Sequence, residues 1–76
     1  MAPNRVTRAM AMATARDYAK THSKEALRVQ VALYREQVKS LNRAKANASE
    51  EEVRRLCERI ADTRELLRAF EKEAAQ

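Results

Sequence analysis

Two series of apolar residues, each repeating at intervals of three and four positions, flank one short polar segment. Such spacing lines up apolar side chains as a seam along one side of an α-helix. Strand-forming residues never alternate with polar ones over a useful length, and the chain contains no glycine. The sequence therefore predicts an all-α fold. The first seam is Leu27, Val31, Tyr34, Val38 and Leu41, and the second is Val53, Leu56, Ile60, Thr63, Leu67, Phe70 and Ala74.

The polar segment 45–49 is the one plausible place for the chain to reverse. Ser49 and Glu52 form a capping box, because the serine can accept the N–H of residue 52 while the glutamate reaches back. A short connection between helices favours antiparallel neighbours. We therefore predict a coiled-coil-like two-helix hairpin over residues 25–76, with its turn near 45–49.

Reversal within the polar segment determines which seam residues face each other. The two seams then bury a single narrow stripe, which leaves little net stability once conformational entropy is subtracted. We therefore expect the chain to gain stability by docking onto something larger. The expected pairs are Leu41 with Leu56, Tyr34 with Thr63, and Leu27 with Phe70.

Residues 1–24 form a basic N-terminal segment that does not continue the seam. The segment is rich in alanine and methionine, which favour helix, and Asn4 is a candidate N-cap. We predict one long helix, with room for a kink, that extends the first hairpin helix beyond the hairpin. The alternative is a separate helix, broken near Thr21-His22-Ser23, with Ser23 capping a new start. In either case we expect nothing within the chain to cover this segment.

Val29 and Leu33 lie far around the helix from the first seam. One interpretation is that they contact a partner protein. Two others are that they are ordinary exposed apolar residues, or that the N-terminal helix folds back over them.

The stretch from Val31 to Leu41 resembles the signature helix of the LYR-motif mitochondrial proteins. It contains Leu33-Tyr34-Arg35, with apolar residues three and six positions after the arginine, at Val38 and Leu41. The resemblance covers residues 27–43, with weaker support from 49–70.

This resemblance implies a small helical adaptor in the mitochondrial matrix or on the matrix side of the inner membrane. Members of the family serve as accessory subunits of respiratory-chain complexes or as assembly factors, and many bind the mitochondrial acyl carrier protein. Tyr34 and Arg35 would then belong to the partner-contacting helix, and Leu33 would be a groove or packing residue. From the residues themselves we expect no cofactor and no metal site, because one histidine and one cysteine cannot make a closed zinc site.

The basic N-terminal segment independently suggests a mitochondrial location. It is nearly free of acidic residues and could place Arg5, Arg8, Arg16 and Lys20 on one side of a helix, as transit peptides do. The alternative is a basic arm for an anionic surface. No apolar run approaches the roughly 20 residues that a membrane span needs.

The leading hypothesis is a non-catalytic accessory or assembly subunit that acts through protein–protein contacts. An enzyme is not expected, because no nucleophile–base pair or phosphate-binding loop is present. We expect His22 to be exposed or at a boundary, and Cys57 to be a small buried hydrophobe. The alternatives are a small RNA-associated protein, favoured by the isoelectric point of about 9.9, and a self-associating coiled coil.

Overall fold

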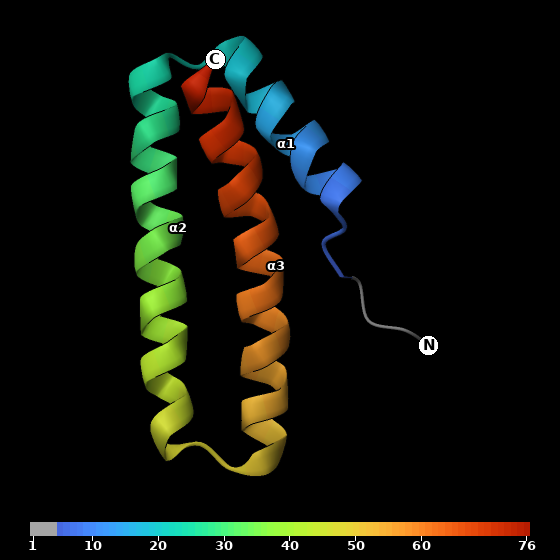
Figure 1. The fold of residues 1–76 in the computed structure, drawn as a ribbon, viewed down its shortest axis with the longest axis vertical. Helices are drawn as coiled ribbons and strands as arrows, with labels where there is room; N and C mark the ends of the chain where they lie inside the picture. The colour runs from blue at the N-terminus through green and yellow to red at the C-terminus, as the bar shows by residue number, and fades with distance from the viewer. Residues whose placement is uncertain (1–4) are drawn as a thin grey trace.

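The computed structural model describes residues 5–76, and every regular element in this range is helical (Figure 1). Helix α1 spans Arg8–Thr21, α2 spans Lys24–Ala44 and α3 spans Glu50–Ala75. A 3₁₀ turn, η1, spans Lys45–Asn47 and joins α2 to α3. The prediction of an all-α chain is confirmed for this range, and the chain reverses within the predicted polar segment.

The start of α3 has the predicted Ser49 cap, but Glu52 reaches back to the Ser49 hydroxyl and not to its backbone N–H. The Ser49 hydroxyl accepts the backbone N–H of Glu52 at 3.3 Å and donates to the Glu52 carboxylate at 3.2 Å. Three glutamates in the first turn also face the positive end of the helix dipole. The cap and the charges together fix where α3 begins.

The N-terminal segment forms a helix of its own, so the prediction of one long kinked helix is wrong. The backbone of His22 is extended (φ −132°, ψ 156°), which ends α1. Ser23 then caps α2 by accepting the N–H of Ala26 at 3.1 Å. A serine side chain at this position can bond to the backbone in place of a continued helix, and here that bond starts α2 as a separate helix.

Helix α1 packs against α3, so the expectation that nothing within the chain covers it is also wrong. Ala11 and Ala15 are 1% and 0% exposed, and they lie one turn apart on the same side of α1. Ala69 of α3 belongs to the same cluster. Small side chains let the two helices approach closely. The cap of α1 is Thr7, which accepts the N–H of Met10, whereas Asn4 lies outside the described residues.

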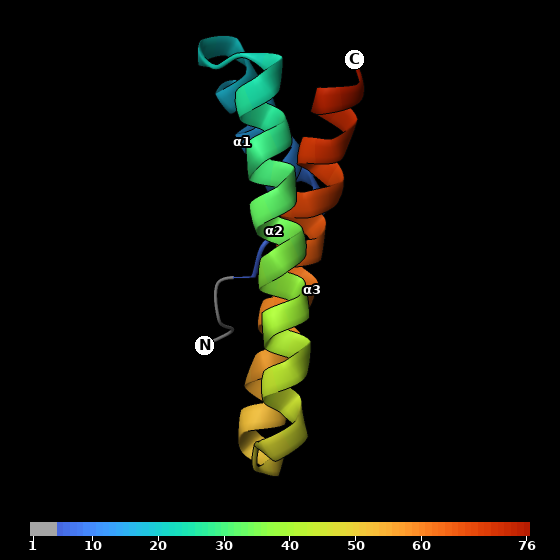
Figure 2. The same ribbon diagram turned by 90° about the vertical axis from the view of Figure 1, so that its left-hand side faces the viewer.

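The three helices lie in one layer with α3 in the middle (Figures 1 and 2). Helix α2 runs antiparallel to α3 along one side of it. On the other side of α3, helix α1 crosses the C-terminal half of α3. The described chain measures 40 × 28 × 15 Å, and its smallest dimension is little more than the diameter of one helix. Among the helices described, none combines the length and hydropathy that a bilayer crossing requires.

The core lies at the end of the layer where all three helices meet. Phe70 is 2% exposed, and its ring centroid lies 5.4 Å from that of Tyr18 and 5.3 Å from that of Tyr34. The expected neighbour of Tyr34 was Thr63. Aromatic side chains on helices point back toward the helix N-terminus, so two of them on antiparallel helices reach toward each other across the interface. The buried cluster is Ala11, Ala15, Leu27, Val31, Ala69 and Phe70.

Replacing Phe70 with alanine tests this core. Phe70→Ala removes the ring on which both tyrosines pack, so we expect a loss of about 3–5 kcal/mol in the free energy of unfolding. Urea denaturation followed by circular dichroism measures this loss. The control is Val29→Ala, because Val29 is exposed and its truncation should change stability by no more than about 0.5 kcal/mol. Equal losses for the two variants would contradict the assignment of the core.

Candidate partner-binding surface

Helix α2 carries a second line of uncharged residues, which we call the α2 stripe. Val29 and Leu33 lie on it and are 54% and 53% exposed. The stripe runs for roughly 27 Å, at 1.5 Å of rise per residue. At 100° per residue, the charged residues of α2 fall outside it. The α2 stripe consists of Ala26, Val29, Gln30, Leu33, Gln37, Ser40 and Ala44.

Nothing in the described chain covers Val29 and Leu33. The N-terminal helix packs on α3 instead of folding back over them, which removes one of the blander interpretations of their position. A shallow hollow of about 540 Å³ lies beside Leu33. The hollow is lined by Gln30, Leu33, Tyr34, Glu36, Gln37, Ser40 and Arg43.

Tyr34 and Arg35 are both turned toward α3. The Tyr34 ring packs against Phe70, and the Arg35 Nη2 atom lies 2.6 Å from Oε2 of Glu71. Arg35 nevertheless keeps 58% of its side chain exposed. Of the tripeptide 33–35, Leu33 is therefore the residue with its apolar surface open to a partner. The other two side chains already make contacts that hold α2 on α3.

Burial raises the pKa of the Tyr34 hydroxyl above its ordinary value of 10.0, and the nearby Tyr18 hydroxyl adds to the effect. The unfolded chain therefore loses this proton at a lower pH than the folded chain does. The contribution of the Tyr34 hydroxyl to the free energy of unfolding is complete below about pH 10. It falls as the pH rises through the pKa of this hydroxyl in the folded chain.

Tyr34→Phe tests this pH dependence. The variant lacks the hydroxyl, so its free energy of unfolding should fall less steeply above pH 10 than that of the natural chain. Urea denaturation over a series of alkaline pH values measures the two slopes, and tyrosinate absorbance locates the titration. Parallel slopes for the two proteins would show that Tyr34 does not carry the effect.

Arg5 attaches the start of the described chain to α3. Its Nε atom donates to Oδ1 of Asp62 at 3.0 Å, and its Nη2 atom donates to the backbone carbonyl of Glu58 at 3.2 Å. The backbone N–H of Val6 donates to the same Asp62 oxygen at 3.2 Å. One carboxylate thus holds two groups at the entrance to α1. In this structure Arg5 contributes to the fold as well as to the basic surface.

Asp62→Ala should loosen this attachment. We expect a loss of about 1 kcal/mol in the free energy of unfolding, and faster amide hydrogen exchange through the first turn of α1. The matched control is Asp17→Ala, which removes the carboxylate of an exposed pair with Lys20 at 3.8 Å. Unchanged exchange in α1 of the Asp62→Ala variant would contradict the role given to this carboxylate.

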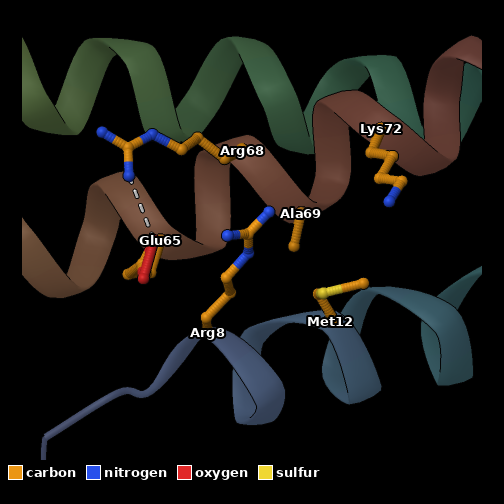
Figure 3. Close-up of a pocket in the computed structure, with 6 residues that line it drawn as sticks. All are labelled: Arg8, Met12, Glu65, Arg68, Ala69 and Lys72. Atoms are coloured by element: carbon orange, nitrogen blue, oxygen red, sulfur yellow. Dashed lines mark hydrogen bonds and ion pairs between the residues drawn. The ribbon is translucent and has the colours of Figure 1, made fainter.

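The other predicted cations of the N-terminal segment lie in different surroundings. Arg16 and Lys20 are exposed. Arg8 faces α3, where it lies beside Arg68 and Lys72 over a hollow of about 340 Å³ (Figure 3). From the sequence we did not predict that α3 contributes Arg68 and Lys72 to this hollow. The only available signal was the spacing of Arg64, Arg68 and Lys72 at every fourth position.

Two further side chains that can be chemically reactive are His22 and Cys57. His22 is exposed, as expected, and its ring stacks on Tyr18 with centroids 3.7 Å apart. Cys57 is exposed, so its expected burial is wrong. The hydrogen bonds that Arg5 makes on this stretch of α3 go to Glu58 and Asp62 and not to Cys57.

Residues 5–76 contain no group of three histidine, cysteine, aspartate or glutamate side chains that could hold a metal ion. The chain matches no protein-family model, and comparison with curated proteins and with solved structures finds no significant similarity. A proposal of function therefore rests on the chain's own sequence and geometry.

Proposed function

We propose that this chain is a non-catalytic accessory or assembly subunit of a multi-subunit complex, which docks on a partner protein through the α2 stripe. The observation that carries the proposal is the exposure of Val29 and Leu33 on a helix face without charge. Isolated exposed apolar residues are common on proteins. Here two of them share a line with five small or uncharged residues over the whole length of α2.

The chemistry of the α2 stripe favours a helix of the partner protein. Small and apolar side chains at intervals of three and four positions suit the packing of one helix against another. The charged residues Glu36 and Arg43 border the stripe on one side and could set the orientation of the partner. On the other side the stripe adjoins the seam of α2 itself, where Tyr34 packs on Phe70 of α3, so a docked helix would extend the apolar contact already present.

We place this function in mitochondria, in a complex of the respiratory-chain type. Support comes from the tripeptide Leu33-Tyr34-Arg35, which resembles the LYR motif, and from the basic N-terminal segment. Acyl carrier protein is a candidate partner on the same grounds. Leu33 would meet the partner directly, while Tyr34 and Arg35 would keep α2 seated on α3.

The RNA-binding alternative is less well supported by the aromatic residues. The chain has three aromatic side chains, and all of them pack together: Tyr18 and Tyr34 each contact Phe70. The Tyr18 ring is also stacked on His22. Proteins that bind single-stranded RNA use free aromatic faces on which bases stack.

A self-associating coiled coil would use the same α2 stripe, so the experiment must separate it from a complex with another protein.

Leu33→Glu tests the proposal. Placing a charge on the α2 stripe should reduce co-purification of specific partner subunits with the tagged chain by at least about tenfold, since burying an unpaired carboxylate is costly. Quantitative mass spectrometry of affinity-purified material from mitochondria measures this change.

The matched control is Ala32→Glu, which adds the same charge to the adjacent exposed position outside the stripe. This variant should retain the partners, and both variants should keep the circular dichroism spectrum of the natural chain. Equal partner retention by the two variants would overturn the proposal. If the natural chain recovered only copies of itself, with sedimentation showing an oligomer, the coiled-coil alternative would replace it.

A further inference from the structure

The hollow between α1 and α3 is separate from the α2 stripe and has a different chemistry. Three cationic side chains surround it: Arg8 from α1, and Arg68 and Lys72 from α3 (Figure 3). Its single acidic group is Glu65, which is paired with Arg68 at 3.2 Å. The lining therefore carries a formal charge of +2.

Two of these cations lack an internal partner. Within residues 5–76, neither Arg8 nor Lys72 takes part in an ion pair, although acidic residues are plentiful on α3. Like charges brought together on two helices repel each other unless something compensates them. The packing of α1 on α3, in which Ala15 and Ala69 belong to one buried cluster, keeps Arg8 and Lys72 at the same hollow despite this repulsion.

The floor of the hollow is apolar. Met12 is half-buried and Ala69 is almost fully buried, and Arg8 and Lys72 lie on either side of them, while Arg68 is turned toward Glu65 (Figure 3). Small-molecule sites typically combine an apolar lining with a few polar groups that fix orientation, and they begin at a volume of about 300 Å³. The hollow of about 340 Å³ is therefore large enough for a small ligand.

We propose that this hollow binds a small phosphate monoester, with the phosphoryl group between Arg8 and Lys72 and the organic part over Met12. A phosphate monoester carries a charge of about −1.5 to −2 at neutral pH, which matches the charge of the lining, whereas a carboxylate would leave half of it uncompensated. The planar fork of an arginine suits phosphoryl oxygens, and lysine supplies a point charge. A methionine thioether is a favourable neighbour for an apolar or aromatic group.

Titration with phenyl phosphate tests the proposal on the full chain. NMR should show saturable shifts of the Met12 methyl group and of the backbone amides of Arg8, Ala69 and Lys72. Benzoate has a similar ring but a single charge, and should bind several-fold more weakly. Inorganic phosphate lacks the ring and should leave the Met12 methyl signal nearly unchanged.

Charge-removing variants locate the site. Arg8→Gln and Lys72→Gln should each weaken phenyl phosphate binding by roughly threefold to tenfold. The control Arg54→Gln removes the same charge from α3 at a point about 20 Å from the hollow, and should leave binding unchanged. A control variant that weakened binding as much as Arg8→Gln would overturn the proposal, since the attraction would then be diffuse. Shifts that failed to saturate would overturn it as well.

A final arm distinguishes a soluble ligand from a lipid headgroup. Vesicles of phosphatidylcholine and phosphatidic acid in equal amounts present the same phosphate monoester on a membrane. If the chain bound these vesicles, Arg8→Gln reduced that binding, and phenyl phosphate neither bound nor competed, the site would belong to a membrane surface and the proposal would be wrong. Competition by phenyl phosphate would support it. None of these results depends on the α2 stripe, so they leave the proposed docking function to its own test.

Discussion

The packing of two tyrosines on Phe70 is the interaction on which this structure depends. Tyr18 comes from α1 and Tyr34 from α2, so the single phenylalanine of α3 joins all three helices at one place. Aromatic contacts of this kind contribute beyond the apolar area that they bury. The lone cysteine is exposed and forms no disulfide. Most of the tertiary stability must therefore come from this end of the layer, and the placement of α1 follows from it.

The sequence predicted α3 and its reversal onto α2 well, because the signals there are local. Ser49 and Glu52 cap a helix wherever it packs, and a seam with intervals of three and four positions has one possible side. The N-terminal segment was harder to predict. Alanine favours a helix without showing which side of it is buried, so the close contact made by Ala11 and Ala15 gives no periodic signal that stands out. Ser23 was recognised as a possible cap, but its strength against a continuing helix could not be judged from the sequence.

The two candidate binding surfaces also differ in how far the sequence could predict them. The positions of Val29 and Leu33 away from the seam could be read from the helical period, and the structure leaves both exposed. The hollow between α1 and α3 could not be predicted, because Arg8 and Lys72 come from opposite ends of the chain. Their proximity requires knowing that α1 lies on α3, and charge counts along the sequence contain no such information.

The buried residues are unevenly distributed along the layer, and this determines which end of the molecule opens more easily. All the buried residues of α2 lie in its N-terminal half, and the most N-terminal buried residue of α3 is Ile60. Toward η1 the layer is only two helices wide, and its seam residues Val38, Leu41, Val53 and Leu56 are half-buried. Segments with little buried area open locally at low free energy. We therefore expect the end near η1 to open and exchange its amide hydrogens first, while the end around Phe70 keeps its shape.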